Sequence, residues 1–169
     1  MYNLDIPGWM AKSELQVIKN LASQVPSGGV IVELGSLRGR SAYAWATSCV
    51  DNVVVYCFDK FDGDFYEDFL ENTKECKNII AVKGECPYTS EYDGPPIDIF
   101  FLDGSHTNPQ DIDAINYFLP HMKSGGIFCG HDYRKHFPDV LANVARLEQL
   151  LTQKVTLFPG TTIWAFRIP

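Results

Sequence analysis

The segment from Val30 to Ala46, VIVELGSLRGRSAYAWA, constrains the fold of this chain more than any other part of the sequence. An apolar run that predicts a buried strand leads into Glu33, and Gly35 and Gly39 follow before a predicted helix. Such a turn places backbone N–H groups and a helix N-terminus at the end of a strand, where they can bind an anionic group of a nucleoside-containing ligand. The segment therefore predicts a cofactor-binding turn.

Helical and extended patterns alternate along nearly the whole chain, which is typical of a parallel sheet with helices on both faces. The predicted strands are 30–34, 53–58, 79–82, 97–102, 127–130, 154–158 and 161–168, and the predicted helices are about 15–25, 40–50, 65–76, 110–119 and 138–151. The last two strands flank the two-residue turn Pro159-Gly160, so they must be antiparallel. We expect an α/β, Rossmann-like, doubly wound and mostly parallel seven-stranded sheet with a reversed C-terminal strand, in one domain of residues 1–169.

Composition and net charge limit the kinds of partner that the chain is expected to bind. The chain has 169 residues, 46% of them hydrophobic, which is enough for one substantial core. Its net charge is −7 and no basic run is present, so stable binding of duplex nucleic acid is disfavoured. The five cysteines form no C-x-x-C pair, and no apolar run reaches the roughly 18 residues that a membrane span needs. We expect a cytoplasmic protein with reduced thiols and no membrane partner.

Carboxylates and histidines follow the fourth and fifth predicted strands. Asp103 and Asp132 should meet at the carboxyl edge of the sheet, because adjacent strands lie about 5 Å apart. Two carboxylates can share Mg²⁺, and His131 as a third ligand would tolerate Mn²⁺. Strand alternation leaves open that His131 is buried on the side opposite to Asp132. His106 lies three residues after Asp103, so a short turn can bring its imidazole to the same site, although a helix-capping role also stays open.

These elements in this order resemble the class I S-adenosylmethionine-dependent methyltransferases. The resemblance covers almost the whole chain and is carried by Glu33-x-Gly35, by Asp59 after the second strand, by Asp103 after the fourth and by the terminal hairpin. Within that superfamily, VELGSLRGRSA, FLDGSH and GGIFCGHDY are similar to the small-molecule and sugar O-methyltransferases related to macrocin O-methyltransferase.

The resemblance implies a set of cofactor contacts. It places Gly35 against the methionine part of S-adenosylmethionine, Glu33 near the ammonium group and Asp59 on the ribose hydroxyls. It assigns adenine recognition and the rim of the site to Gly84, Glu85, Ser36, Ser41, Lys60 and Asp103. It implies His106 as a general base that acts with Asp103, and the cation at Asp103, His131 and Asp132 would assist it.

Two other functions stay open on the sequence alone. One is a regulatory domain that binds S-adenosylmethionine without catalysis. The other is an NAD-dependent oxidoreductase, which the pattern E-x-G-x-x-x-G disfavours because it lacks G-x-G-x-x-G. For a methyltransferase we expect a small-molecule or sugar acceptor. Little chain precedes the first helix, so we expect a shallow pocket, or one that the acceptor or a second subunit of a homodimer completes.

Overall fold

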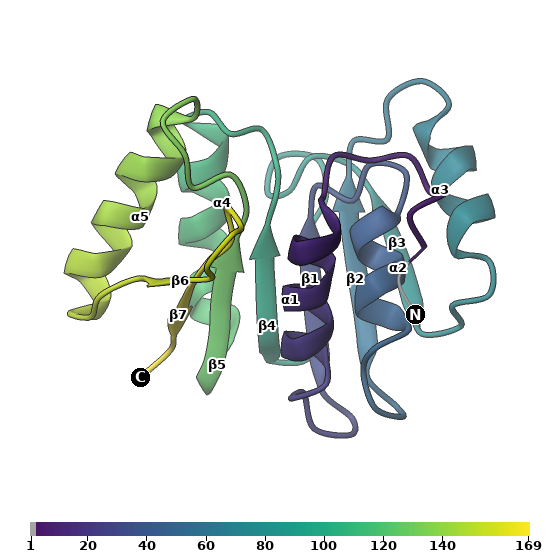
Figure 1. Cartoon of the computed structure of the whole chain (residues 1–169), viewed down its shortest axis with the longest axis horizontal. Helices are drawn as coiled ribbons and strands as arrows, with labels where there is room; N and C mark the ends of the chain where they lie inside the picture. The colour runs from purple at the N-terminus through teal and green to yellow at the C-terminus, as the bar shows by residue number, and fades with distance from the viewer. Residues whose placement is uncertain (1–2) are drawn as a thin grey trace.

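The computed structural model describes residues 3–169, and Met1 and Tyr2 lie outside the described residues. Seven strands form one sheet in the order β3-β2-β1-β4-β5-β7-β6 (Figure 1). The strands are β1 Val30–Leu34, β2 Val54–Asp59, β3 Ile79–Lys83, β4 Ile97–Leu102, β5 Met122–Gly130, β6 Thr156–Leu157 and β7 Trp164–Arg167. Strands β1 to β5 pair in parallel, and β7 runs antiparallel to both of its neighbours. The predicted fold class, including the reversed C-terminal strand, is confirmed.

Helices cover both faces of this sheet. They are α1 Lys12–Ala22, α2 Arg40–Ala46, α3 Phe65–Thr73, α4 Gln110–Phe118 and α5 Pro138–Leu151, with a short 3-10 helix at Leu119–His121. Alternate strand side chains divide the core: Ile31 and Phe101 pack with α1, α2 and α3, whereas Val32 and Phe100 pack with α4 and α5. Figure 1 shows α1 in front of the sheet. The two cores hold the strand ends in fixed positions.

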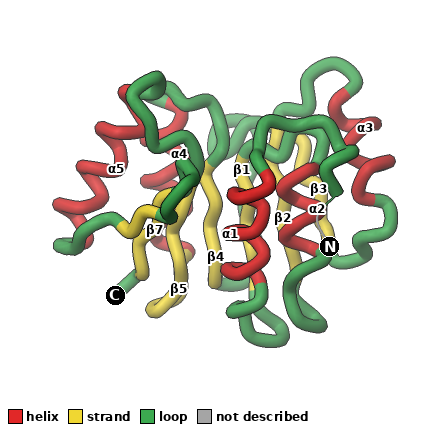
Figure 2. Tube along the Cα trace, viewed as in Figure 1, coloured by secondary structure: helices red, strands yellow, loops and turns green. Residues whose placement is uncertain are grey.

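The pairing register of the central strands places their carboxyl ends side by side at one edge of the sheet. Leu34 of β1 pairs with Leu102 of β4, and Leu102 pairs with Gly130 of β5. The ladder continues one residue further, because the Asp103 N–H donates to the Leu34 carbonyl at 2.8 Å and the His131 N–H donates to the Leu102 carbonyl at 3.0 Å. Loops that follow the parallel strands therefore meet along one edge, the upper edge in Figure 2.

Helices α2 and α3 end earlier than their apolar patterns predict, as does α1, which spans Lys12–Ala22 rather than about 15–25. Helix α2 ends at Ala46 rather than near residue 50, and α3 ends at Thr73 rather than near residue 76. In both, a threonine hydroxyl donates to the carbonyl four residues earlier: Thr47 to Tyr43 and Thr73 to Phe69, each at 2.7 Å. These side-chain hydrogen bonds compete with continuation of the helix.

The C-terminal strands also differ in extent from the prediction. Strand β5 begins at Met122, five residues before the predicted start, because Met122 already pairs with Ile97 of β4 and the backbone of Gly125 and Gly126 pairs with that of Ile168. Strand β6 has only two residues, and residues 158–163 connect it to β7, so the two-residue turn was wrong. The antiparallel pairing does not depend on the length of this connection.

The cysteine side chains form no disulfide in residues 3–169. All five cysteines are free, and Cys57, Cys86 and Cys129 are buried. Burial raises the pKa of the Cys57 thiol, so this side chain stays protonated within the core.

Among residues 3–169, no helix is both long and apolar enough to span a lipid bilayer.

Candidate functional site

One large cavity opens at the carboxyl edge of the sheet. Its volume is about 810 Å³, within the range of about 300–1,000 Å³ that is usual for ligand pockets. Segments at or directly after the carboxyl ends of all five parallel strands line it: 34–38 at the end of β1, 58–60 at the end of β2, 84–86 after β3, 103–106 after β4 and 131–132 after β5. The cavity therefore lies where an open α/β sheet binds its ligands.

The glycine turn after β1 packs closely against the end of β4. Gly35 has φ 95°, and a Cβ atom at this position would lie 1.9 Å from the Asp103 carbonyl oxygen. Only glycine fits such an approach in this backbone conformation. The resemblance explains Gly35 by its closeness to the ligand, and the structure adds the contact between strand ends as a second reason.

Glu33 lies behind the cavity wall. Its side chain is fully buried and accepts hydrogen bonds from Ser36 Oγ at 2.6 Å and from Trp45 Nε1 at 3.1 Å, and Ser41 also donates to it. Burial raises the pKa of Glu33 to about 7, despite these hydrogen bonds. Ser36 and Ser41 line the cavity, whereas Glu33 is not among its lining residues. The structure thus places Glu33 as a support for the turn, and its contact with the ammonium group of the ligand stays a prediction.

Asp59 supports the same turn from β2. Its Oδ2 accepts the backbone N–H of Leu37 at 2.8 Å, and its Oδ1 accepts that of Phe61 at 2.7 Å. The carboxylate lines the cavity, and each oxygen keeps a further lone pair for a ligand hydroxyl. Next to it, Lys60 forms an ion pair with Glu85 at 2.9 Å. The structure brings these predicted rim residues together.

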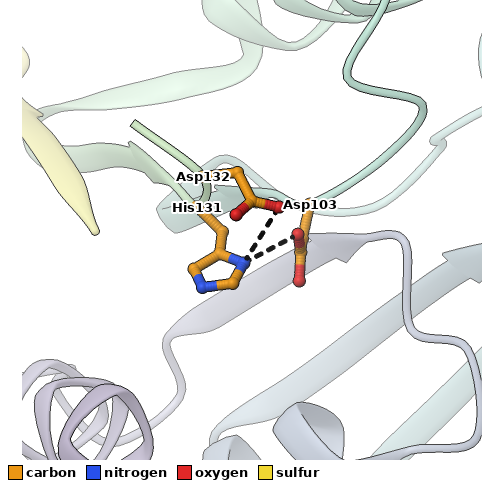
Figure 3. A group of neighbouring side chains, drawn as sticks. All are labelled: Asp103, His131 and Asp132. Carbon is orange, nitrogen blue, oxygen red and sulfur yellow. Dashed lines mark hydrogen bonds and ion pairs between the residues drawn. The ribbon is translucent and has the colours of Figure 1, made fainter. Parts of the chain in front are cut away.

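Three side chains that follow β4 and β5 converge at the cavity wall (Figure 3). His131 Nδ1 lies 3.2 Å from Asp103 Oδ1 and 3.6 Å from Asp132 Oδ2. One ligand atom from each residue lies within 4.8 Å of the other two. Two carboxylate oxygens and one imidazole nitrogen are a donor set that fits a divalent cation of the Mn²⁺ type.

The backbone explains why His131 and Asp132 face the same site. Strand alternation would place these successive side chains on opposite sides of the sheet. However, Asp132 has φ 59°, in the left-handed region, which ends the strand geometry and turns its carboxylate toward His131. The interpretation that His131 is buried on the side away from Asp132 was therefore wrong.

His106 completes this group of polar side chains. Its Nε2 lies 3.2 Å from Asp103 Oδ1 and 3.1 Å from Asp132 Oδ2, and its ring packs on Phe137 with the centroids 4.7 Å apart. Burial alone would lower the pKa of His106, but hydrogen bonds to the two carboxylates outweigh it and raise the pKa to about 9. The turn after β4 thus brings the imidazole to Asp103, as its three-residue spacing predicts.

The segment before α1 forms one wall of the cavity. Residues 7–10 line it, and the Arg40 guanidinium holds the segment by donating to three of its carbonyl oxygens, at 2.6 to 3.2 Å, those of Leu4, Ile6 and Met10. The indole of Trp9 is 89% exposed within this wall. The short segment before α1 thus builds a wall because one guanidinium fixes it, and completion of the pocket by the acceptor or a second subunit stays a prediction.

Two further residues were missed. Glu14 of α1 lies 3.0 Å from His131 Nε2, and Arg134 lies 2.6 Å from Asp132 Oδ1. Glu14 had a detectable signal, because an acidic residue on the apolar face of a helix must be paired when buried. Arg134 had none, since a basic residue in a loop is usually solvated.

Comparisons with known proteins agree with this architecture. Residues 32–133 match a family model described as a methyltransferase domain. No curated protein matches the sequence significantly. The structure is similar to a precorrin-6y C5,15-methyltransferase from Geobacter metallireducens, with a TM-score of 0.71 and 13% identity over 99% of this chain and 94% of that chain.

Two other solved structures are similar. The O-methyltransferase TomG from Streptomyces achromogenes, solved in complex with SAM, has a TM-score of 0.69 and 15% identity over 98% of this chain and 83% of that chain. An rRNA methylase from Streptococcus thermophilus has a TM-score of 0.66 and 16% identity over 95% of this chain and 100% of that chain. The three names indicate different kinds of acceptor, so these likenesses show the fold alone.

Proposed function

The chain belongs to the methyltransferase domain family, of the class I S-adenosylmethionine-dependent type, and from that premise we propose that it methylates a hydroxyl group of a small molecule or sugar. The proposed machinery comprises a divalent cation held by Asp103, His131 and Asp132, with His106 as the general base. One observation carries the proposal: these four side chains meet at the wall of the same cavity that Asp59 lines.

The proposed donor site runs along the glycine turn. S-adenosylmethionine supplies a methyl group that its sulfonium already activates, so the protein mainly aligns the reactants and excludes water. Gly35 and Ser36 present the backbone of the turn to the cavity, and Asp59 offers two carboxylate oxygens to the ribose. Carboxylates outnumber basic side chains among the lining residues, which suits a cationic methyl donor.

The proposed acceptor site lies at the cluster that follows β4 and β5. An alcohol is a poor nucleophile until its proton leaves, and the His106 imidazole is placed to accept that proton in its neutral form. A cation bound to Asp103 and Asp132 would favour the neutral form, because it would offset the negative charge of the carboxylates that raise the pKa of His106. A divalent cation at the neighbouring carboxylates would stabilise the negative charge that develops on the acceptor oxygen. Asp103 and Asp132 hold the His106 ring from one side and Phe137 packs on its face, so the ring is fixed before the acceptor binds.

The charge of the cavity favours a small acceptor over nucleic acid. The net charge of the chain is −7, and Asp103, Asp132 and Glu14 all lie at the cavity wall. Phosphate groups would be repelled there, because nucleic-acid binding depends on basic side chains that neutralise the backbone. A vicinal diol, as in a sugar or a catechol, could instead place both oxygens on one cation.

A transfer assay tests this proposal. The full chain is incubated with S-adenosylmethionine carrying a labelled methyl group and a panel of catechols and sugars with vicinal hydroxyls, in the presence of Mn²⁺, Mg²⁺ or EDTA. We expect labelled product with at least one of the diols, and loss of turnover in EDTA. Calorimetry with S-adenosylhomocysteine should show binding, with NAD as the control ligand.

Three results would contradict the proposal. Binding of NAD without S-adenosylhomocysteine would exclude the proposed donor. Transfer that proceeds equally well in EDTA would remove the cation from the account. Binding of S-adenosylhomocysteine with no transfer to any diol, but transfer to a nitrogen or carbon acceptor, would overturn the assignment of a hydroxyl acceptor.

A further inference from the structure

Glu14 is a buried carboxylate at the cavity wall that the proposed reaction does not use. Its exposed fraction is 6%, and its Oε1 lies 3.0 Å from Nε2 of His131, which is also 6% exposed. We propose that Glu14 is a positioning residue, which fixes the His131 ring with Nδ1 toward Asp103 and Asp132 and so makes the site prefer Mn²⁺ over Mg²⁺. This inference rests on the proposed cation site and adds a determinant of its selectivity.

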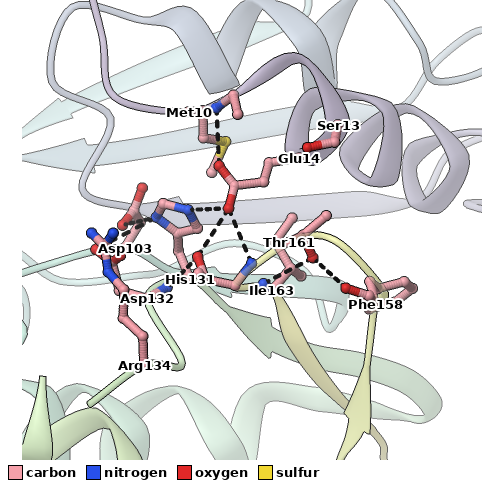
Figure 4. Close-up of polar contacts among 12 residues, drawn as sticks. Met10, Ser13, Glu14, Asp103, His131, Asp132, Arg134, Phe158, Thr161 and Ile163 are labelled. Atoms are coloured by element: carbon pink, nitrogen blue, oxygen red, sulfur yellow. Dashed lines mark hydrogen bonds and ion pairs between the residues drawn. The ribbon is translucent and has the colours of Figure 1, made fainter. Parts of the chain in front are cut away.

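The Glu14 carboxylate is itself held in place (Figure 4). Its Oε1 accepts hydrogen bonds from the backbone N–H of Thr162 at 3.1 Å and from the Thr162 hydroxyl at 2.9 Å. Its Oε2 accepts the backbone N–H of Ala11 at 2.9 Å, at the start of α1. Contacts from two distant parts of the chain therefore fix both oxygens, and the carboxylate can act as a rigid reference for the imidazole.

The two nitrogens of His131 face different partners. Nε2 faces Glu14, whereas Nδ1 lies 3.2 Å from Asp103 Oδ1. A carboxylate this close to Nε2 favours a proton on that nitrogen and so leaves the lone pair of Nδ1 as the ligand atom. Rotation of the ring by half a turn would place carbon atoms against both carboxylates, and Glu14 disfavours that orientation.

This orientation has a consequence for the choice of cation. Mg²⁺ prefers oxygen ligands, whereas an imidazole nitrogen suits transition ions. If Nδ1 of His131 is presented to the cation by Glu14, loss of Glu14 should weaken the binding of Mn²⁺ more than that of Mg²⁺. Removal of the carboxylate partner of a metal-ligating histidine typically weakens metal affinity by about 10–100-fold.

Calorimetric titration of Mn²⁺ and Mg²⁺ into the full chain tests the inference. We expect Glu14→Gln to weaken Mn²⁺ binding by about 10–100-fold, with a smaller effect on Mg²⁺. In a His131→Ala background the same substitution should have no further effect on Mn²⁺ affinity, because Glu14 acts through the imidazole. Glu148→Gln is the matched control: Glu148 anchors a backbone N–H, that of Val155 at 3.0 Å, away from the cavity lining.

Each other outcome is informative. Unchanged Mn²⁺ affinity in Glu14→Gln, or an equal loss with and without His131, would overturn the positioning role while the cation site stands. Absence of Mn²⁺ binding by the unmodified chain would overturn both the inference and the cation of the proposed function. If Glu14→Gln does not fold, Glu14→Asp applies the same criteria, because it keeps the charge but withdraws the carboxylate by one methylene.

Discussion

Two carboxylates near the cavity show how single residues acquire different chemistry within one fold. Burial alone would raise the pKa of both Glu33 and Asp103. Glu33 is surrounded by neutral donors such as Ser36, so burial prevails and its pKa is raised to about 7. At Asp103, hydrogen bonds to His106 and His131 outweigh burial and lower the pKa. Glu33 is therefore suited to supporting the glycine turn, and Asp103 remains charged, as the proposed cation site requires.

The raised pKa of Glu33 makes stability depend on pH. Between about pH 4.5 and pH 7 the folded chain keeps a proton on Glu33 that the unfolded chain has lost, so the free energy of unfolding falls as the pH rises. Glutamine does not titrate, so in Glu33→Gln this contribution to the pH dependence should disappear. The free energy of unfolding of the variant minus that of the unmodified chain should therefore be about 3 kcal/mol higher at pH 8 than at pH 4. Urea denaturation across this range measures it, and parallel stability curves would contradict the assignment.

His106 allows a direct examination of catalysis. His106→Gln should lower the rate of methyl transfer by about 10²- to 10⁴-fold, because the acceptor loses its general base. Affinity for S-adenosylhomocysteine should remain, since the glycine turn and Asp59 are untouched. The exposed His136 supplies the control, His136→Gln, which should keep full activity. A rate that survives in His106→Gln would exclude this residue as the base.

At the scale of elements, the site depends on how closely the ends of neighbouring strands pack. Gly35 after β1 touches the backbone of Asp103 after β4, and the left-handed φ of Asp132 turns the end of β5 toward the same point. The segment before α1 then closes one side through its hydrogen bonds to Arg40. The cavity is thus built from element ends, with the sheet as a rigid support.

Gly35→Ala examines the packing of these strand ends. Its Cβ would overlap the Asp103 carbonyl, so we expect a loss of about 3 kcal/mol or more in the free energy of unfolding. Gly28→Ala is the matched control, because Gly28 also has positive φ, at 78°, but has no heavy atom within 4 Å of the added Cβ. That variant should lose only about 1–2 kcal/mol. Equal losses of unfolding free energy in the two variants would mean that the close approach of Gly35 to the Asp103 carbonyl does not restrict this position.

Arg40→Ala examines the wall formed by the segment before α1. Three charge-assisted hydrogen bonds to backbone carbonyls would be lost, so the segment should become sensitive to limited proteolysis while the sheet stays intact. Binding of S-adenosylhomocysteine or of the acceptor should weaken. Arg146→Ala removes an exposed guanidinium from α5 and should change neither property. Resistance to proteolysis equal to that of the unmodified chain would argue against a role for Arg40 in holding the wall.

For the whole molecule, local sequence patterns predicted the arrangement of elements better than the contacts between them. Alternating helix and strand patterns suffice for the sheet, and carboxylates after strands lead to the positions of Asp59, Asp103 and Asp132. Glu14 could not be paired with His131 in advance, because more than 100 residues separate them and only tertiary packing joins them. The turn of Asp132 toward His131 likewise depends on one backbone angle that no residue pattern signals.

The central claim is that one edge of the sheet holds a methyl donor next to a cation. A crystal structure of the full chain grown with S-adenosylhomocysteine and Mn²⁺ tests it most directly, because anomalous scattering locates the metal. The account predicts the ribose at Asp59 and an anomalous peak bounded by Asp103, His131 and Asp132. S-adenosylhomocysteine outside the cavity, or Mn²⁺ bound only at other carboxylates, would contradict it.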